Sequence, residues 1–322
     1  MHIRLYSKDD RAAVVALWNR EATKYDYKPF DEREFEDTLI DHAYFDEKCT
    51  WVGCKGEEII GFAAGCSGSD LPLGEVAGYI TCVIVDARVA SPELYDAFLT
   101  RMEDRFEELG KKQAEVLFFN PVKLKWLIPG TPQHEHNNAP GIGKDLPLYD
   151  ALIARGYADR ATQCGMYLKL GNFVIPEDII GKETSASGKG YEVKLLDRAV
   201  HTGLEATLDA LQNPMWQKDV VAYVKDGAPL VVAVHGNEVV GFAGPIIVEP
   251  SGRAFFCGIG VHPEHEGHGL GSVLFFRMVE AFEHAGCQYI SLFTGSNNPA
   301  IRIYQKAGFT AVKSFSILRR EI

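Results

Sequence analysis

The stretch that decides the fold is Val261-His262-Pro263-Glu264-His265-Glu266-Gly267-His268-Gly269-Leu270-Gly271-Ser272. A strand-like run over residues 254–261 precedes it, and apolar residues at helical spacing follow it at Val273, Leu274, Met278 and Phe282. Glycines let the backbone approach a ligand closely, and a helix N-terminus presents free N–H groups and a favourable dipole to an anion. The order strand, glycine loop, helix therefore predicts a cradle for a phosphate group.

Length and composition indicate a folded protein of about two domains. The chain has 322 residues, of which 46% are hydrophobic and 24% charged, as in soluble globular proteins. Its formal net charge of −11 argues against a nucleic-acid binder, which normally presents a basic face, and weakly favours cationic substrates. No apolar run approaches the ~20 residues of a membrane span, and no secretory segment is evident. Seven scattered cysteines without a CxxC pair favour a reducing, cytoplasmic compartment.

The chain contains two copies of one plan. Residues 55–63 and 235–243 both read as a hairpin whose second strand ends in Gly-Phe-Ala, at an offset of 180 residues. The similarity resumes at Val85 and Val261 with an offset of 176, and a Gly-aromatic step recurs at 156 and 308 with an offset of 152. The first copy therefore carries an insertion between its central helix and its last helix.

Each copy reads as strand, helix, two to three antiparallel strands, loop, helix, strand, helix, strand. This order predicts an α+β fold with a mixed, mostly antiparallel sheet, a parallel central pair and flanking helices. The Ser/Gly/Lys-rich run 175–190 is typical of a linker, so the predicted domains are 1–174 and 191–322. In the first copy, the strand after the central helix is predicted over 114–119.

The second copy resembles the GNAT N-acetyltransferases over residues 191–322. In that family a loop of the form Arg/Gln-x-x-Gly-x-Gly/Ala follows a Val-x-Pro and holds the pyrophosphate of acyl-CoA; Val261-His262-Pro263 and Gly269-Leu270-Gly271 are similar to it. A second family signature, Asn-x-x-Ala-x-x-x-Tyr-x-x-x-Gly-Phe, matches Asn297, Ala300, Tyr304 and Gly308-Phe309. The resemblance implies a tandem GNAT protein whose N-terminal copy is degenerate. Glu266 departs from the family's Arg or Gln, and its side chain is expected in solvent, with only its backbone N–H contributing.

The resemblance assigns cofactor contacts to three segments. Strand residues Ile259, Gly260 and Val261 would hold the pantetheine arm, and a backbone N–H there would polarise the thioester carbonyl. The loop Glu266–Ser272 would hold the pyrophosphate, with His268 either adding a positive contact or facing solvent. Asn297 would cap the last helix or contact the cofactor arm, and Ala300 would keep that helix face narrow. No metal is expected.

The strand itself offers a separate reading. Strand alternation places Phe255, Cys257, Ile259 and Val261 on one face, and Phe256, Gly258 and Gly260 on the other. Two glycines on one face predict either close approach by a ligand or another backbone, or a bulge that splays the strand.

Tyr304 is the predicted general acid. A phenol of ordinary pKa about 10 stays protonated at pH 7 and can donate to a departing thiolate of pKa about 8.5. The alternative is a core tyrosine on an amphipathic helix. For the general base the strand offers no acid, so Glu249, His235, His262 and a water chain all stay open. Trp216 could line an acceptor pocket or belong to the core.

The first copy lacks these residues. The offset of 176 places Ala90-Ser91-Pro92-Glu93-Leu94-Tyr95 where the second copy has its glycine loop. Pro92 has no N–H, and Glu93 brings a negative charge to the helix start. The offset of 152 puts Leu152 in the place of Tyr304. We therefore predict that the first copy binds no CoA.

The inserted segment of the first copy, within 120–147, reads as a long Pro/Gly loop of undetermined role. His134 and His136 could bind a metal together with a neighbouring acid, although two histidines at this spacing are more typical of a solvated polar loop.

Together these features predict an N-acyltransferase that moves an acetyl group from acetyl-CoA to a primary amine of a small molecule. The second copy would be active, and the amine would attack directly without a covalent enzyme intermediate. A non-catalytic CoA-binding sensor or scaffold is the alternative; the missing strand carboxylate and Glu266 favour it, and Tyr304 disfavours it. The sequence does not identify the amine, the acyl chain length or the oligomeric state.

Overall fold

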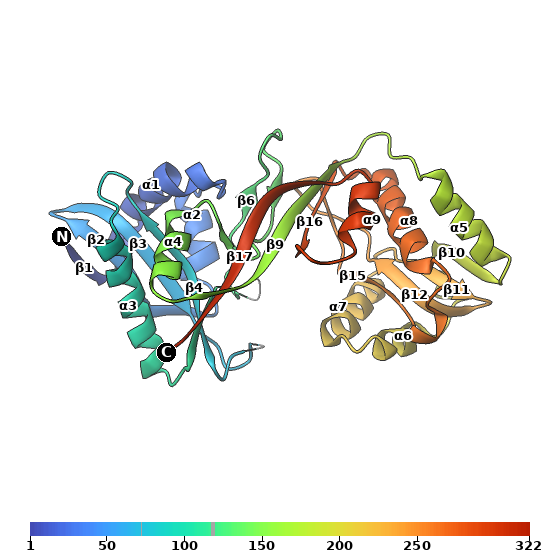
Figure 1. Cartoon of the computed structure of the whole chain (residues 1–322), viewed down its shortest axis with the longest axis horizontal. Helices are drawn as coiled ribbons and strands as arrows, with labels where there is room; N and C mark the ends of the chain where they lie inside the picture. The colour runs from blue at the N-terminus through green and yellow to red at the C-terminus, as the bar shows by residue number, and fades with distance from the viewer. Residues whose placement is uncertain (72, 117–119) are drawn as a thin grey trace. The chain divides into compact units, whose positions relative to one another are not determined.

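The computed structural model describes residues 1–71, 73–116 and 120–322, and it divides the chain into two compact units (Figure 1). Unit 1 comprises Met1–Met166, Leu292–Asn298 and Ala311–Ile322; unit 2 comprises Tyr167–Ser291 and Pro299–Thr310. The units differ from the predicted domains at the C-terminus, because the last residues of the second copy lie in unit 1.

Unit 1 is built on a mixed sheet. Its strand order is β1 (His2–Leu5), β2 (Phe45–Lys55), β3 (Glu58–Cys66), β4 (Ala77–Val85), β5 (Gln113–Val116), β17 (Thr310–Glu321) and β9 (Ala158–Lys169). Strands β4 and β5 are parallel, whereas β17 runs antiparallel to β5. Of the strand predicted over 114–119, residues 117–119 lie outside the described residues.

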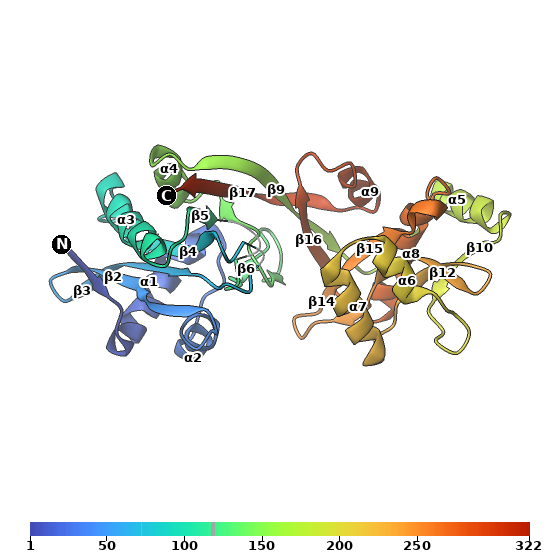
Figure 2. The ribbon, with the colours of Figure 1, turned by 90° about the horizontal axis from the view of Figure 1, so that it is seen from below.

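Helices cover both faces of this sheet. They are α1 (Arg11–Glu21), α2 (Glu32–Phe35), α3 (Pro92–Glu108) and α4 (Pro147–Ala154), joined by short helical turns at Lys8–Asp10, Ala22–Tyr25 and Glu36–Ile40. Figures 1 and 2 show α1 and α2 on one side, and α3 and α4 on the other. Fully buried aromatic rings fill the layers between, including Trp18, Phe35, Phe62, Phe98 and Phe106.

Unit 2 repeats the plan. One sheet has the order β10 (Tyr191–Leu195), β11 (Val231–His235), β12 (Glu238–Gly244) and β15 (Gly258–Val261). Beside it, β13 (Ile247–Val248) pairs with β14 (Arg253–Phe255), which runs parallel to β16 (Tyr289–Gly295). The helices are α5 (Glu177–Ser187), α6 (Leu204–Ala210), α7 (Pro214–Lys225), the turn Pro263–His265, α8 (Leu270–His284) and α9 (Ile301–Lys306).

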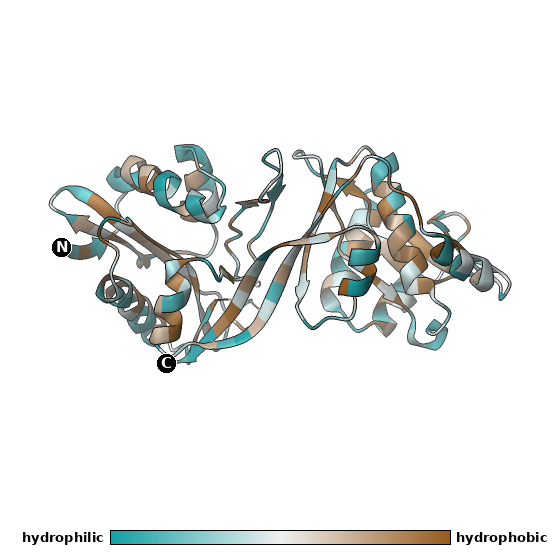
Figure 3. Ribbon diagram, turned by 45° about the horizontal axis from the view of Figure 1, so that its top comes forward, coloured by the Kyte–Doolittle hydropathy of each residue, from teal (hydrophilic) through white to brown (hydrophobic). Residues whose placement is uncertain are grey.

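The two faces of the unit 2 sheet have different covers. In Figure 1, α6 and α7 lie on one face, and α5, α8 and α9 lie on the other. Under α6 and α7, Leu208, Val220 and Phe242 are fully buried, and α8 buries Phe275, Phe276 and Phe282. Figure 3 shows many hydrophobic residues along the strands and both hydrophobic and hydrophilic residues on the helices. No helix in the described ranges is long and apolar enough to cross a membrane.

The predicted fold class is confirmed. Both copies follow the same element order, and each contains one parallel pair, β4–β5 and β14–β16. The last strands agree closely, because β9 starts at 158 and ends at 169 while β17 starts at 310 and ends at 321. Both ends differ by the offset of 152 residues found in the sequence.

The predicted linker 175–190 contains helix α5 instead. Pro176 precedes its first turn, Glu177 and Asp178 favour the positive end of the helix dipole, and Ile179 and Ala186 are buried, seven residues apart on one helix face. Glu183 forms an ion pair with Arg277 of α8 at 2.5 Å. The small and polar composition masked an amphipathic helix that packs on unit 2.

Candidate active site

The strand before the glycine loop is interrupted. Arg253 of β14 pairs with Tyr289 of β16, but Gly258 of β15 pairs with Gly244 of β12. The pairing with β16 ends at Phe256 and Cys257, which belong to neither strand, whereas the antiparallel pairing on the other edge passes from β13 to β12. After this point β15 is the last strand of its sheet, so one of its edges is open to a ligand.

The faces of the strand slip by one residue at the same point. The Phe255 ring lies 6.0 Å from the Tyr223 ring of α7. A Cβ added at Gly258 would meet the Trp216 ring of α7 at 2.4 Å. An odd-numbered residue, Phe255, and an even-numbered one, Gly258, thus both face α7, although a regular strand would point them to opposite sides. This break in the alternation identifies a β-bulge. Of the two alternatives predicted from the glycines, the bulge is therefore correct. The face that carries the glycines is not an open surface, because Trp216 covers Gly258 and Leu211 would lie 2.5 Å from a Cβ at Gly260.

The open edge of β15 presents the backbone of two predicted residues. His262 donates its N–H to the Val240 carbonyl at 2.8 Å. In an antiparallel ladder the amides alternate between the two edges, so the amides of Gly258 and Gly260 face β12, and those of Ile259 and Val261 face the open edge. The sequence placed Ile259, Gly260 and Val261 in the site; the alternation makes Ile259 and Val261 available and directs the Gly260 amide into the sheet.

The glycine loop forms the expected cradle. Gly267 and Gly269 have φ of 79° and 77°, values that glycine adopts without strain. Gly269 is the N-cap of α8 and offers no side chain to the first turn. Within the described ranges, the N–H groups of the six residues 267–272 make no hydrogen bond. Glu266 is exposed, as expected, although its N–H is 3.4 Å from the Pro263 carbonyl. Consecutive unpaired N–H groups at a helix N-terminus suit a phosphate.

Basic residues reach this loop from α5 and the turn after it. The aliphatic stem of Lys182 lies 3.5 Å from the position of a Cβ at Gly269. The ammonium group of Lys189 is 3.4 Å from Nδ1 of His268. Neither lysine was predicted from the sequence, because both lie in the run interpreted as a linker.

Tyr304 lies on α9 with its ring against α8. Its ring centroid is 5.2 Å from that of Phe275 and 5.9 Å from that of Phe309. Its hydroxyl makes no hydrogen bond to any described residue. Burial raises the pKa of the phenol above its ordinary value, so the group is protonated at neutral pH.

Asn297 does not cap the last helix. It is exposed in the turn after β16, and Ala300 is the N-cap of α9, which has no side-chain cap. The capping role is therefore wrong, because the helix begins three residues later than a cap at Asn297 requires. Contact of Asn297 and Ala300 with the cofactor stays a prediction.

The three candidate bases lie away from the bulge. Glu249 forms a two-point ion pair with Arg253, at 2.7 and 3.0 Å, and Arg253 is only 4% exposed. His235 and His262 lie at the loop end of β15, and each ring centroid is about 6 Å from that of His265 (6.0 and 5.7 Å). The bulge is four residues further along the strand, ~13 Å at strand spacing.

A carboxylate that the sequence analysis missed faces the bulge. Asp219 is one turn from Trp216 and one turn from Tyr223, so the three share a face of α7. Trp216 donates its indole N–H to the Cys257 carbonyl at 3.0 Å. Burial and the nearby Asp219 carboxylate raise the pKa of the Cys257 thiol to about 12. Asp219 is half-buried and makes no ion pair within the described part of the chain. The helical spacing of residues 216, 219 and 223 is the sequence feature that could have placed Asp219 beside the two aromatic residues.

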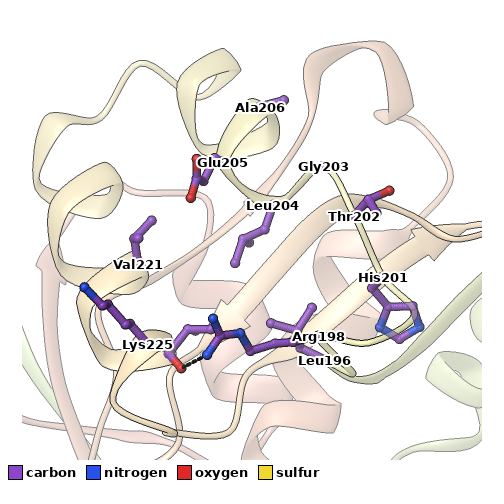
Figure 4. A pocket seen from close by; sticks show the side chains of 11 residues that line it. Leu196, Arg198, His201, Thr202, Gly203, Leu204, Glu205, Ala206, Val221 and Lys225 are labelled. Atoms are coloured by element: carbon purple, nitrogen blue, oxygen red, sulfur yellow. Dashed lines mark hydrogen bonds between the residues drawn. The ribbon is translucent and has the colours of Figure 1, made fainter.

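A separate pocket of about 410 Å³ lies where the β10–α6 connection meets α7 (Figure 4). Its lining includes the charged side chains of Arg198 and Lys225 opposite Glu205, together with the His201 ring, and Arg198 donates to the Val224 carbonyl at 3.4 Å. This lining suits an anion better than an amine. None of the predicted site residues lines it.

The start of the central helix differs in the first copy. Ser91 is the N-cap of α3, and its hydroxyl accepts the Leu94 N–H at 3.3 Å. Pro92 lacks an N–H. Hydrogen bonds from the backbone N–H of Glu93 and from the Ser91 hydroxyl lower the pKa of the Glu93 carboxyl. Leu152, at the position of Tyr304, is fully buried. These residues satisfy the helix start without a ligand.

The inserted loop of the first copy is folded. It forms β6 (Trp126–Leu127), β7 (Glu135–His136) and β8 (Ile142–Gly143). His134 and His136 are buried, and His136 stacks on Trp126 at 5.6 Å. The prediction of a solvated loop is therefore wrong, because the imidazole rings of His134 and His136 are buried in unit 1. No cluster of potential metal ligands occurs among the residues that the structure describes.

Comparisons with known proteins agree with this geometry. Residues 193–309 match the Acetyltransferase (GNAT) family. This segment is a GNAT-family acetyltransferase domain. The domain contains β15, the glycine loop, α8 and Tyr304. A comparison with curated proteins finds no match.

Solved structures extend the likeness to both copies. A GCN5-related glucosamine N-acetyltransferase region of a fungal multi-domain β-N-acetylglucosaminidase has TM-score 0.67 and 15% identity; it covers 99% of this chain, which spans 38% of that protein. A GCN5-related N-acetyltransferase from Sphaerobacter thermophilus has TM-score 0.63 and 16% identity over 99% and 95% of the two chains. A tandem GNAT protein from the clavulanic acid biosynthesis pathway has TM-score 0.58 and 14% identity over 99% and 98%. At these identities the likeness concerns the fold.

Proposed function

We propose that the second copy transfers an acetyl group from acetyl-CoA to a primary amine of a small molecule. The observation that supports it most is that six N–H groups, those of residues 267–272, have no hydrogen-bond partner among the described residues and come soon after the open edge of β15. The loop has donors for a pyrophosphate, and the amides of Ile259 and Val261 can extend the sheet along an extended pantetheine arm. When bound, acetyl-CoA supplies the acyl group as an activated thioester.

Tyr304 is the proposed proton donor to the departing thiolate. Its hydroxyl has no protein partner among the described residues, and its raised pKa keeps it protonated at neutral pH. A departing thiolate, whose thiol has a pKa of about 8.5, is a weaker base than this phenolate, so the proton transfer is uphill and has to accompany cleavage of the carbon–sulfur bond.

Asp219 is the proposed contact for the amine. Together with Trp216 and Tyr223 it forms an aromatic and acidic face of α7 above the bulge. A carboxylate without an ion-pair partner attracts an ammonium group, and the aromatic rings favour a cation at their faces. The role of a base for the attacking nitrogen also falls to Asp219, since Glu249 is held by Arg253.

The first copy is proposed to bind no CoA, and the copies 1–174 and 191–322 to differ in role. Ser91, Pro92 and Glu93 occupy or remove the donors that a phosphate would need. We also propose a cytoplasmic protein that acts without nucleic acid or membrane, because all seven cysteines are free thiols and the net charge is acidic.

Calorimetric titration with acetyl-CoA tests the proposal. We expect one molecule per chain, and at least roughly 100-fold weaker binding by Gly269→Glu, whose carboxylate would lie beside the phosphates. Gly269→Asn is the matched control, since asparagine tolerates a positive φ and adds no charge. Two molecules per chain, or unchanged affinity of the glutamate variant, would contradict the proposal.

Release of CoA with a panel of amines tests the transfer itself. Turnover with a cationic amine, lost in Asp219→Asn, is the expected result. Tight acetyl-CoA binding without turnover on any amine would support the sensor or scaffold instead.

A further inference from the structure

Two lysines next to the cradle lie outside the GNAT-family match. That match begins at residue 193, whereas Lys182 and Lys189 come from α5 and the turn after it. The Lys182 stem lies over Gly269, and the Lys189 ammonium group lies beside His268. Neither lysine forms an ion pair with a carboxylate in the described ranges, since Asp178, whose pKa is lowered by Lys306 and less strongly by Lys182, pairs with Lys306. Both ammonium groups can therefore meet an anion.

An aromatic cluster adjoins these lysines. Tyr191 is only 7% exposed and lies beneath three imidazole rings, with centroids 4.8 Å from His235, 5.7 Å from His265 and 4.9 Å from His268. Its hydroxyl is 3.0 Å from Nδ1 of His265. The His268 ring is inclined by 32° to the tyrosine ring and is half-buried. The Tyr191 ring therefore packs against one face of the His268 ring, and the other face of the His268 ring stays accessible.

Helix α5 is firmly held. Glu183 pairs with Arg277 of α8, and Asp178 pairs with Lys306 of α9. Ile179 is 2% exposed and packs inward. The lysines are thus presented by a docked helix rather than a flexible segment, which lowers the entropy lost when they bind a ligand.

We propose that Lys182, Lys189 and His268 bind the phosphorylated nucleotide end of acyl-CoA. This inference rests on the proposed function. The pyrophosphate uses the loop N–H groups, but the nucleotide has a further phosphate monoester and an adenine. The two ammonium groups match the monoester, and the supported His268 ring matches the adenine face.

The charges around the loop fit this assignment. The loop lacks the basic side chain found in the family, because Glu266 stands in its place, and Glu264 is also acidic. Both glutamates are exposed. Without the two lysines the side chains of this surface would oppose a polyanion, so α5 restores the positive charge that the loop has lost.

Calorimetry with CoA and 3′-dephospho-CoA separates the contacts. The wild type should bind CoA about ten-fold more tightly than the dephospho form, the effect of charge-assisted hydrogen bonds to one phosphate. Lys182→Ala/Lys189→Ala should abolish this preference and leave affinity for the dephospho form unchanged. Lys218→Ala removes an exposed lysine of α7 on the other face of the sheet and should keep the preference. His268→Ala should weaken both ligands equally, since both contain adenine.

The outcomes distinguish this inference from the proposed function. A double lysine variant that retains the full preference for CoA overturns the monoester contact. Equal loss of both ligands in that variant overturns it as well, because the lysines would then contact the pyrophosphate. A wild type that binds both ligands equally removes the inference but leaves the proposed function. A wild type that binds neither removes both. Thermal melting of each variant verifies its fold.

Discussion

The central helices of the two copies end at equivalent positions but begin at different ones. Helix α3 ends at Glu108 and α8 at His284, which differ by the offset of 176 residues. Helix α3 begins at Pro92, whereas α8 begins at Leu270, two positions later on the same offset. Two residues of the glycine loop, His268 and Gly269, therefore correspond to Pro92 and Glu93, which are helical in the first copy.

The difference shows how a helix start can serve either stability or a ligand. In α3 the Ser91 hydroxyl, Pro92 and the Glu93 carboxylate satisfy or remove the donors of the first turn. In α8 the corresponding donors are unpaired among the described residues. An uncapped first turn costs stability, and a bound phosphate would recover it. The capped and uncapped starts thus predict different losses of stability for the same serine-to-alanine substitution.

The largest expected effect concerns the equivalent positions of the last helices, Tyr304 of α9 and Leu152 of α4. Tyr304→Phe removes only the hydroxyl, so kcat should fall about 100-fold or more, as expected for loss of a general acid, while acetyl-CoA affinity is unchanged. Leu152→Met, at the equivalent position of the first copy, should leave kcat unaltered. Steady-state kinetics with a responsive amine provides the measurement, and a phenylalanine variant with normal kcat would exclude Tyr304 as the acid.

The parts of the fold that the sequence predicted depend on local pattern. The strand, loop and helix around Gly269 follow from glycines and apolar spacing, and the repeat follows from equal offsets, so that even β9 and β17 have equivalent ends. Local pattern did not reveal α5, because Gly181, Ser185 and Ser187 dominate its composition while only Ile179 and Ala186 reach the core.

Other features depend on tertiary contacts that no local pattern encodes. The bulge at Phe256 and Cys257 reverses the side-chain alternation, and it lies where the strand stops pairing with β16. Burial of His136 depends on the Trp126 ring ten residues away. Asp219 belongs to the site only because α7 crosses the bulge, so a search along the strand could not find it.

A second difference between the copies lies one residue after the matched valines. Asp86 of the first copy is fully buried and bonds with Arg88 and Arg20 at 2.6 and 2.8 Å, which holds its pKa well below the ordinary value. The folded-state pKa is depressed, so the stabilisation is present above the unfolded pKa of about 3.9 and is lost as pH falls below it. Asp86→Asn should cost about 2 kcal/mol at pH 7 and progressively less below pH 4.

The equivalent residue of the second copy, His262, should matter less for stability. It accepts one backbone N–H, from Glu264 at 3.3 Å, so His262→Asn should change the free energy of unfolding by about 0.5 kcal/mol or less. Urea titrations followed by fluorescence compare the two, because Trp18, Trp51 and Trp126 report on unit 1 and Trp216 on unit 2. An equal cost for both variants would contradict the contrast drawn here.

The smallest expected effect tests the helix starts directly. Ser91→Ala removes the N-cap hydrogen bond of α3 and should destabilise the protein by about 1 kcal/mol. Ser272→Ala changes the first turn of α8, where the side chain makes no hydrogen bond to a described residue, and should cost about 0.5 kcal/mol or less. Acetyl-CoA should raise the melting temperature of both variants as it does that of the wild type, since the Ser272 N–H is retained and α3 is not part of the site. If acetyl-CoA instead failed to stabilise the Ser91 variant alone, α3 would have to contribute to binding, and the division of roles between the two helix starts would be wrong.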